Sequence, residues 1–214
     1  MTQERLISDL IKRYPALEDI KDEILQAYRQ FVSCYEAGGK LLLAGNGGSA
    51  ADAEHMAGEL MKGFKLERPL DAELRGKLLE VDEEIGAELG ASLQSTLTAV
   101  TLVSHVALST AYLNDVGSEG LFAQQLLGFG RPGDVLVGIS TSGNSRNVLE
   151  AAVLAKAIGI SVVGLTGKDG GKLKDYADIS VCVPEEETFL IQEYHLPIYH
   201  CWCRMLEEHF FGRD

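Results

Sequence analysis

The sequence predicts an α/β fold in which a parallel sheet carries helices on both faces and an N-terminal helical segment precedes it. Short apolar runs alternate with longer stretches of helical periodicity, the pattern of a parallel sheet covered on both sides. The chain has 214 residues, 46% of them hydrophobic, which is enough for one substantial core. We expect a helical segment over residues 1–39 and a single α/β domain over residues 40–214.

The elements follow in chain order. Residues 3–37 predict one or two helices, because their apolar residues recur at helical spacing and the run ends at the Gly38-Gly39 pair. The turn at Arg131–Asp134 separates a helix from the next strand, since proline and glycine interrupt both kinds of element. Expected strands are 40–45, 97–103, 134–140, 160–166 and 179–183, and expected helices are 49–64, 105–113, 118–128, 145–158 and 187–210.

Residues 66–94 stand apart, because acidic side chains there alternate with leucines and other apolar residues. The pattern predicts an amphipathic helix and a connector. A solvated face on a surface helix explains the charges, and a partner-binding surface is the alternative. Because the leucines need an apolar partner, a further hypothesis makes this segment a helical cover over the site or over a neighbouring subunit.

Composition excludes several functions. The formal net charge of −13 disfavours direct nucleic-acid binding, which relies on clustered lysine and arginine. No apolar run approaches the roughly 18 residues of a membrane span. Four scattered cysteines and the absence of an apolar signal segment favour the cytoplasm. Cys201 and Cys203 point to different sides of a helix, so packing explains them better than a shared metal.

Two turns rich in glycine and serine indicate a phosphate site. Residues 45–49 and 140–145 each follow a predicted strand and open a predicted helix. Glycines let the backbone approach an anion, hydroxyls donate hydrogen bonds, and a helix N-terminus favours negative charge. Neither turn fits the dinucleotide fingerprint or the nucleotide P-loop. A tight turn and a helix cap are the alternatives for either turn alone, and both turns would meet at one edge of a parallel sheet.

Two further segments contain residues suited to acid–base chemistry. His55 and Glu59 share one helix face and come directly after the first turn, which suggests that they lie beside the ligand-binding edge. Gln192 and His200 lie about 80° apart in projection and roughly two turns apart along the last helix. A surface contact explains a His–Glu pair equally well. A carboxylate and an imidazole are, however, the groups that an aldose–ketose isomerisation needs.

Four segments of the chain closely resemble the phosphoheptose isomerases, the sedoheptulose 7-phosphate isomerase family within the sugar isomerase (SIS) domain superfamily. The resemblance covers roughly residues 15–65 and 96–210 and implies a single SIS-type domain. Its most specific segments are GNGGSAADAEHMAGEL, GISTSGNSRNV, LTGKDGGKL and IQEYH. The segment LTGKDGGKL is rich in glycine and follows a predicted strand, so it either flanks the site or forms a surface loop.

The resemblance also implies roles for individual residues. Glu59 would be the general base and His200 its acid/base partner in an ene-diol mechanism. Some family members bind zinc, here at the positions of His55, Glu59, Gln192 and His200, where it would act as a Lewis acid on the sugar carbonyl. Substrate and its phosphate would be bound by Asn46, Gly47, Gly48, Ser49, Ser140, Thr141, Ser142, Ser145 and Gln192, with Asn114 and Asp115 in a turn next to the site.

The family forms homotetramers with active sites between subunits, so the resemblance implies the same assembly here. Two positions depart from the family pattern. Gly63 replaces an arginine that contacts substrate, with Lys62 and Lys65 as possible substitutes, and His105 replaces an expected aspartate. These departures leave the identity of the sugar open.

Three functions remain in competition. The resemblance implies an isomerase that makes D-glycero-D-manno-heptose 7-phosphate for the heptose of lipopolysaccharide. A related branch without catalytic activity associates with the bacterial replication initiator, but it lacks the residues that correspond to Glu59 and His200. The third possibility is a phosphosugar sensor or an aldose–ketose isomerase for another sugar phosphate.

Overall fold

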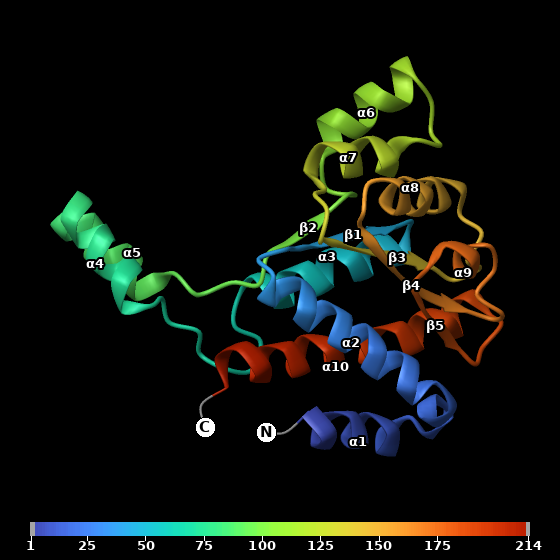
Figure 1. The fold of residues 1–214 in the computed structure, drawn as a ribbon, viewed down its shortest axis with the longest axis horizontal. Coiled ribbons are helices and arrows are strands. Elements are labelled where there is room, and N and C mark those ends of the chain that lie inside the picture. Colours follow the sequence, from blue (N-terminus) through green and yellow to red (C-terminus); the bar gives the residue numbers. More distant parts are fainter. Residues whose placement is uncertain (1–2, 213–214) are drawn as a thin grey trace.

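A computed structural model describes residues 3–212, which form a five-stranded parallel sheet in the order β2-β1-β3-β4-β5 (Figure 1). Four of the strands lie within one residue of the ranges expected from the sequence, and β2 is two residues shorter than expected at each end. The strands are β1 (Leu41–Gly45), β2 (Ala99–Thr101), β3 (Val135–Ser140), β4 (Ser161–Gly167) and β5 (Ile179–Val183). The α/β class and the parallel sheet are thereby confirmed.

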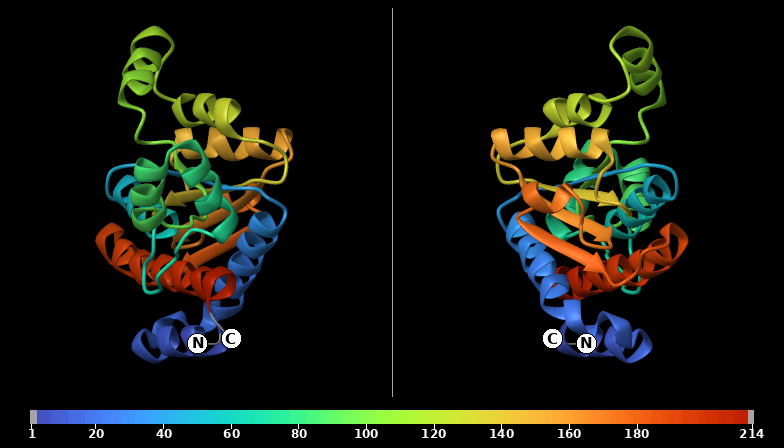
Figure 2. Two further views of the ribbon diagram at one scale, coloured as in Figure 1. Left: turned by 90° about the vertical axis from the view of Figure 1, so that its left-hand side faces the viewer. Right: turned by 90° about the vertical axis from the view of Figure 1, so that its right-hand side faces the viewer.

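Helices cover both faces of this sheet, as Figure 2 shows from two sides. The helices are α1 (Gln3–Arg13), the 3₁₀ helix η1 (Pro15–Ile20), α2 (Lys21–Glu36), α3 (Gly48–Met61), α4 (Ala72–Val81), α5 (Glu83–Ser92), α6 (Val106–Asp115), α7 (Leu121–Phe129), α8 (Arg146–Ala157), α9 (Leu173–Tyr176) and α10 (Thr188–Phe211). The sequence did not predict α9, a single turn that follows the glycine-rich loop after β4.

Alternation along β1 explains why the sheet has two apolar faces. Leu41 and Leu43 point into the core shared with α1, α2, α3 and α10, whereas Leu42 and Ala44 point into the core shared with α7 and α8. Successive side chains of a strand lie on opposite faces, so one apolar run supplies both cores. The two layers hold the ends of β1 and β3 in fixed positions.

The N-terminal helices pack on α10 and are part of the same core as the sheet. Trp202 of α10 is fully buried, donates from Nε1 to the carbonyl of Ile24 at 2.9 Å, and meets the ring of Phe31 edge to face at 5.3 Å. Leu6 and Leu10 of α1 are buried in this core as well. The helical segment thus contributes to the layer that covers α10.

Residues 66–94 form two short helices, where the sequence predicted one. Asp82 ends α4 and caps α5, because its carboxylate accepts a hydrogen bond from the amide of Ile85 at 2.8 Å. The resulting α4–α5 hairpin projects from the body of the domain (Figure 1), and Gly86 is the single buried residue of its two helices. It does not cover the domain to which it belongs.

Cys201 and Cys203 pack in the interior, as the sequence predicts, and Cys34 is buried as well. All four are free thiols, and those at positions 201 and 203 point to different partners, the carbonyls of Leu6 and Met56. Among residues 3–212, no helix has the length and apolarity needed to cross a membrane.

Candidate active site

The two predicted phosphate turns lie side by side at the carboxyl ends of neighbouring strands. β1 and β3 pair in parallel with Gly45 opposite Ile139, so the turns that leave them start at the same edge of the sheet. The chain passes from β1 outward to β2 and then returns to β3 on the other side of β1. Such a reversal of strand order is where open α/β sheets bind their ligands.

The first turn depends on glycine at two positions. Gly47 has φ +58°, a conformation that favours glycine. A Cβ on Gly48 would lie 2.5 Å from the side-chain amide nitrogen of Gln192, so the last helix approaches this turn closely. Gly47 and Gly48 are exposed, whereas Ser49 is buried beneath them.

The second turn is held by its own hydroxyls and by the glycine-rich loop after β4. Ser140 and Ser145 are joined Oγ to Oγ at 2.9 Å, and the amide of Asn144 donates to Ser142 Oγ at 3.2 Å. Gly143 and Gly170 approach so closely that a Cβ on Gly143 would overlap the Gly170 carbonyl. The loop over residues 166–171 therefore packs directly against the second turn and helps to hold it in place.

A reciprocal amide pair joins the first turn to the first turn of α8, directly after the second phosphate turn. Asn46 and Asn147 each donate from their side-chain nitrogen to the other's side-chain oxygen, both at 2.9 Å. Asn147 was not among the residues selected from the sequence, although it lies in the motif that follows the second turn. We refer to residues 45–49 and 140–145 together as the phosphate cradle.

Two histidines and a glutamate form a separate cluster between α3 and α10. His55 Nε2 lies 3.3 Å from Glu59 Oε1 and 3.4 Å from His200 Nε2. The Lys62 ammonium lies 3.2 Å from the other carboxylate oxygen of Glu59. These three side chains, His55, Glu59 and His200, are the acid–base cluster.

Tyr199 and Asp52 orient His55 within this cluster. The Tyr199 hydroxyl donates to Asp52 Oδ1 at 3.3 Å and lies 3.0 Å from His55 Nδ1. Since its one proton goes to the carboxylate, the hydroxyl accepts from an Nδ1–H of His55. This tautomer leaves the Nε2 lone pair of His55 facing Glu59 and His200. Neither Tyr199 nor Asp52 was predicted from the sequence, although Asp52 lies one helical turn before His55.

Burial changes the titration of two groups here. Burial, and then the nearby His55, lower the pKa of His200, so its neutral form persists to lower pH. Burial raises the pKa of Asp52, an effect that the Tyr199 hydrogen bond opposes. A neutral His200 is able to accept a proton near pH 7.

The donor set of the acid–base cluster suits a divalent cation. His55 Nε2, Glu59 Oε1 and His200 Nε2 are donor atoms of the kinds that zinc accepts, and His55 Nε2 lies within 3.4 Å of the other two. A tetrahedral zinc ion with ligands near 2.05 Å separates them by about 3.3 Å, close to the two distances observed. Within residues 3–212, however, no three His, Cys, Asp or Glu side chains are placed to hold an ion as they lie.

The structure does not bring all the predicted site residues together. Gln192 meets Gly48 at the cradle, whereas His200 meets His55, about 12 Å further along the axis of α10. α3 likewise carries Glu59 away from the cradle, contrary to the expectation that the His–Glu pair lies beside it. Eleven residues separate Gly48 from Glu59, which is about 16 Å of helix.

Asn114 and Asp115 lie at the end of α6, on the outer side of α7 and away from the cradle (Figure 1). Their side chains hydrogen-bond to each other at 2.8 Å and are exposed. His105 packs its ring against that of Phe129, with the centroids 4.8 Å apart. These three residues do not contribute to the cradle or the acid–base cluster of the chain to which they belong.

The segment after α3 is fixed by a buried ion pair. Glu207 of α10 accepts hydrogen bonds from the amides of Phe64 at 2.7 Å and Lys65 at 2.8 Å, and from Arg68 Nε at 2.8 Å. Both charged side chains are buried. A Cβ on Gly63 would meet the carbonyl of Leu66 at 2.6 Å, so the arginine of the family does not fit this backbone without rearrangement.

The fold, with its cradle at the carboxyl ends of the strands, defines a SIS domain protein. The SIS domain family matches residues 89–202, and a second family, also described as a SIS domain, matches residues 7–77.

The similarity to individual proteins extends over almost the whole chain. The phosphoheptose isomerase of Akkermansia muciniphila is 37% identical over 206 residues, covering 96% of this chain and 95% of its own length. That of Helicobacter pylori strain P12 is 38% identical over 93% of this chain and 90% of its own. The chain belongs to the phosphoheptose isomerase family.

Solved structures agree with this assignment. The phosphoheptose isomerase of Neisseria gonorrhoeae is 34% identical with a TM-score of 0.71, covering 96% of this chain and 98% of its own. The enzyme of Francisella tularensis is 30% identical with a TM-score of 0.75, covering 97% of this chain and all of its own.

Proposed function

We propose that this protein interconverts sedoheptulose 7-phosphate and D-glycero-D-manno-heptose 7-phosphate through an ene-diol. The observation that carries the proposal is the acid–base cluster, in which His55 Nε2 lies within 3.4 Å of both Glu59 Oε1 and His200 Nε2. Full-length similarity to phosphoheptose isomerases supports the substrate. The phosphate cradle supplies a site for its anionic end.

In the ketose, Glu59 removes a proton from C1, and the electron pair forms the C1–C2 double bond while the carbonyl oxygen on C2 takes up a proton. Return of the proton to C2 and loss of the proton from the C1 hydroxyl give the aldehyde. His200 moves the proton between the two oxygens, a role that suits a histidine whose lowered pKa keeps it neutral near pH 7.

Zinc is the cofactor that the acid–base cluster fits best. His55, Glu59 and His200 would hold it, and Tyr199 would fix the orientation of His55 in the manner of an outer-shell partner. Bound there, zinc supplies a Lewis acid that polarises the sugar carbonyl. Metal analysis of the purified protein, and turnover before and after treatment with a chelator, test this part of the proposal.

We infer that a complete site combines two copies of the chain. A heptose 7-phosphate has eight bonds between C1 and phosphorus, which span about 10 Å at roughly 1.2 Å per bond of an extended chain. The cradle and Glu59 of one chain are about 16 Å apart along α3. The ligand alone falls short of this backbone separation, which supports a site where the cradle of one copy combines with the acid–base cluster of another, as expected for a homotetramer with active sites between subunits. With that pairing, Gln192 would accompany the cradle.

Exposed apolar side chains support such an assembly. Leu79, Val81 and Ile85 of the α4–α5 hairpin are 47%, 87% and 57% exposed, and Val106 of α6 is 71% exposed. Burial against a neighbouring subunit would remove this surface from water. Replacing residues 71–93 by a short linker should leave the domain folded but shift its sedimentation toward smaller species. Unchanged assembly and turnover would make the hairpin dispensable.

The substitution Glu59→Gln tests the chemistry. It keeps the size of the side chain but removes the basic oxygen, so turnover should fall by about 10²-fold or more. Folding and binding of the sugar phosphate should persist. Parent-like turnover of the variant, or no activity of the parent on any ketose phosphate, would favour a binding protein without catalytic activity.

Mixing two inactive variants tests the shared site. Chains with Glu59→Gln and chains with Ser140→Tyr, which blocks the cradle, should each be inactive alone. Unfolded together and reassembled, they should regain up to about a quarter of parental activity, because some interfaces then combine an intact cradle with an intact cluster. Mixed assemblies without activity would place both halves of the site in one chain.

The cytoplasm is the expected location, since all four cysteines are free thiols. A different sugar phosphate is the second candidate substrate. Gly63 stands where the family has an arginine that contacts substrate, and the backbone around Gly63 has no room for that side chain. Turnover of a panel of ketose phosphates distinguishes the two substrates.

A further inference from the structure

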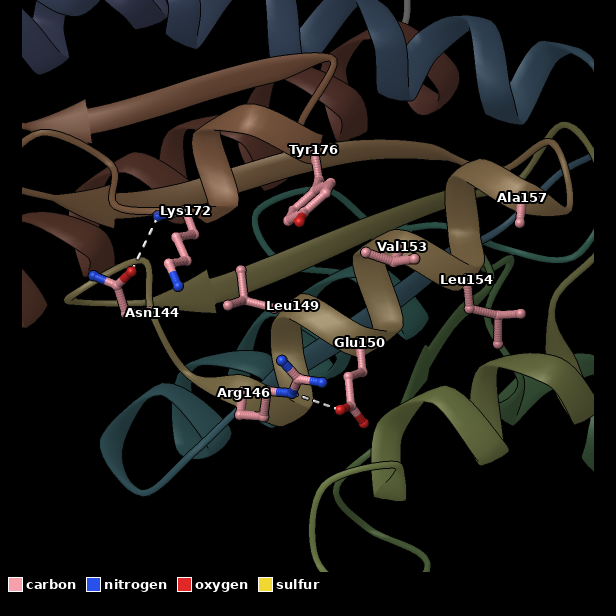
Figure 3. Close-up of a pocket in the computed structure, with 9 residues that line it drawn as sticks. All are labelled: Asn144, Arg146, Leu149, Glu150, Val153, Leu154, Ala157, Lys172 and Tyr176. Carbon is pink, nitrogen blue, oxygen red and sulfur yellow. Dashed lines mark hydrogen bonds and ion pairs between the residues drawn. The ribbon is translucent and has the colours of Figure 1, made fainter.

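A groove of about 590 Å³ lies along the outer side of α8, facing α9 (Figure 3). It is on the sheet face opposite to α3 and α10, so it is separate from the acid–base cluster. Side chains from both helices and from the loops before them line it. The residues that matter are Asn144, Arg146, Leu149, Val153, Lys172 and Tyr176.

The middle of the groove is apolar and suited to a flat molecule. Tyr176 projects from α9 toward Leu149 and Val153 of α8 (Figure 3). The tyrosine is 37% exposed and Val153 is 48% exposed, so both offer surface to an occupant. A planar group placed between the ring and the aliphatic side chains would be covered on two sides.

The end of the groove near Asn144 carries positive charge. Arg146 Nε donates to Glu150 Oε1 at 2.6 Å and lies 4.0 Å from Glu119, so carboxylates already balance much of its charge. Lys172 differs, since no ion pair engages its ammonium within residues 3–212. With Glu119 and Glu150 both beside Arg146, the charges around the groove nearly balance, and Lys172 is the local cation that favours an anion.

We infer that this groove binds a phosphate monoester carried on a flat apolar body, such as a nucleoside monophosphate or an aryl phosphate. The apolar wall and the ring of Tyr176 take the flat body, and Lys172 takes the phosphate. A sugar phosphate offers no apolar plane to this wall, so the groove is not a second site for the substrate.

The groove is connected to the phosphate cradle. Asn144 belongs to the second turn, and its side-chain oxygen accepts a hydrogen bond from the amide of Lys172 at 3.1 Å. The carbonyl of Gly143 accepts from the amide of Leu173 at 2.9 Å. A ligand that shifts α9 therefore shifts the cradle, which makes the groove a regulatory site. This effect on substrate rests on the proposed function, whereas binding itself does not.

Calorimetric titration with adenosine 5′-monophosphate and with 1-naphthyl phosphate tests the binding. Adenosine and inorganic phosphate serve as controls that each lack one half of the ligand. Both monoesters should bind, and each control should bind at least about tenfold more weakly, since it loses either the charged hydrogen bonds or the stacking. A preference between the two monoesters shows whether a nucleoside or a simple aryl body fits better.

Variants locate the site. Lys172→Glu should weaken binding by about tenfold or more, and Val153→Trp should abolish it by filling the groove. Lys12→Glu on α1 makes the same charge change far away and should have no effect. Circular dichroism of each variant checks the fold.

Failure of both monoesters to bind would overturn the inference. So would binding that survives Val153→Trp, or binding that is lost in Ser140→Tyr but kept in Lys172→Glu, because the probe would then occupy the cradle. In the active parent, the bound monoester should change KM for the sugar phosphate more than kcat. An unchanged KM would refute the regulatory role alone.

Discussion

Tyr199→Phe removes one hydroxyl from the hydrogen-bond chain behind the acid–base cluster. In the parent, this hydroxyl accepts from His55 Nδ1 at 3.0 Å and donates to Asp52 Oδ1 at 3.3 Å. Among the described residues, Asp52 Oδ2 already has no hydrogen-bond partner. The variant therefore leaves a half-buried carboxylate without any donor and frees the His55 ring to rotate or to change tautomer.

Two consequences of different size follow. Loss of an outer-shell partner typically costs about 10–100-fold in metal affinity or activity, so turnover and zinc affinity should both fall within that range. The unpaired carboxylate should lower stability by about 1–3 kcal/mol, which corresponds to roughly 2–4 °C of Tm per kcal/mol in a chain of this size. Asp52 should also become harder to ionise, because Tyr199 at present opposes the effect of burial on its pKa.

Steady-state kinetics with sedoheptulose 7-phosphate, zinc titration against a competing chelator, and thermal unfolding measure the three effects. Tyr35→Phe is the matched control, since it removes a tyrosine hydroxyl that donates only to the carbonyl of Thr98 at 3.2 Å. It should cost about 1 kcal/mol of stability and leave turnover unchanged. If Tyr199→Phe keeps parental turnover and zinc affinity, His55 does not depend on this chain of hydrogen bonds.

Three other substitutions test the cradle, the buried ion pair and a buried imidazole. Ser142→Ala should weaken sugar phosphate binding by about 1 kcal/mol in calorimetry, and unchanged affinity would make the second turn a helix cap alone. Glu207→Ala should lower the unfolding free energy in urea by about 3–5 kcal/mol, because Arg68 is left buried and unpaired, and a loss below 1 kcal/mol would contradict this. Burial lowers the pKa of His195 from 6.5 to about 4. Between these two pH values the imidazole is protonated in the unfolded chain but neutral in the folded chain. Stability should therefore be lost as pH falls from about 6.5 toward 4. His195→Gln should lose less stability than the parent over that range in urea titrations, and equal losses would mean that other groups dominate.

The fold was predictable because apolar periodicity is a local property. β1 and β3 are buried along their whole length, and their sequences are almost entirely apolar runs that follow Lys40 and Asp134 and end at the two turns. The hairpin was predicted less well. A single aspartate, Asp82, splits the expected helix in two by leaving the helical conformation and capping the next turn.

The acid–base cluster was predictable only in part. Spacing placed His55 and Glu59 on one helix face, but it contained no information on how α3 and α10 lie against each other. The two helices run with Gly48 beside Gln192 and His55 beside His200, which separates Gln192 from the histidines. Tyr199 acts on His55 across the same helix contact, so no pattern within either helix indicated its role.

The reciprocal amide pair between Asn46 and Asn147 has a consequence for how ligand binding responds to salt. Neither residues 45–49 nor residues 140–145 contain a lysine or arginine, and the pair that spans them is uncharged. Ions in solution screen long-range attraction between charged side chains and a ligand, but they have little influence on close hydrogen bonds from backbone amides and hydroxyls. The cradle should therefore hold a phosphate almost as well at high ionic strength as at low, with association that is slower than in sites lined by cations.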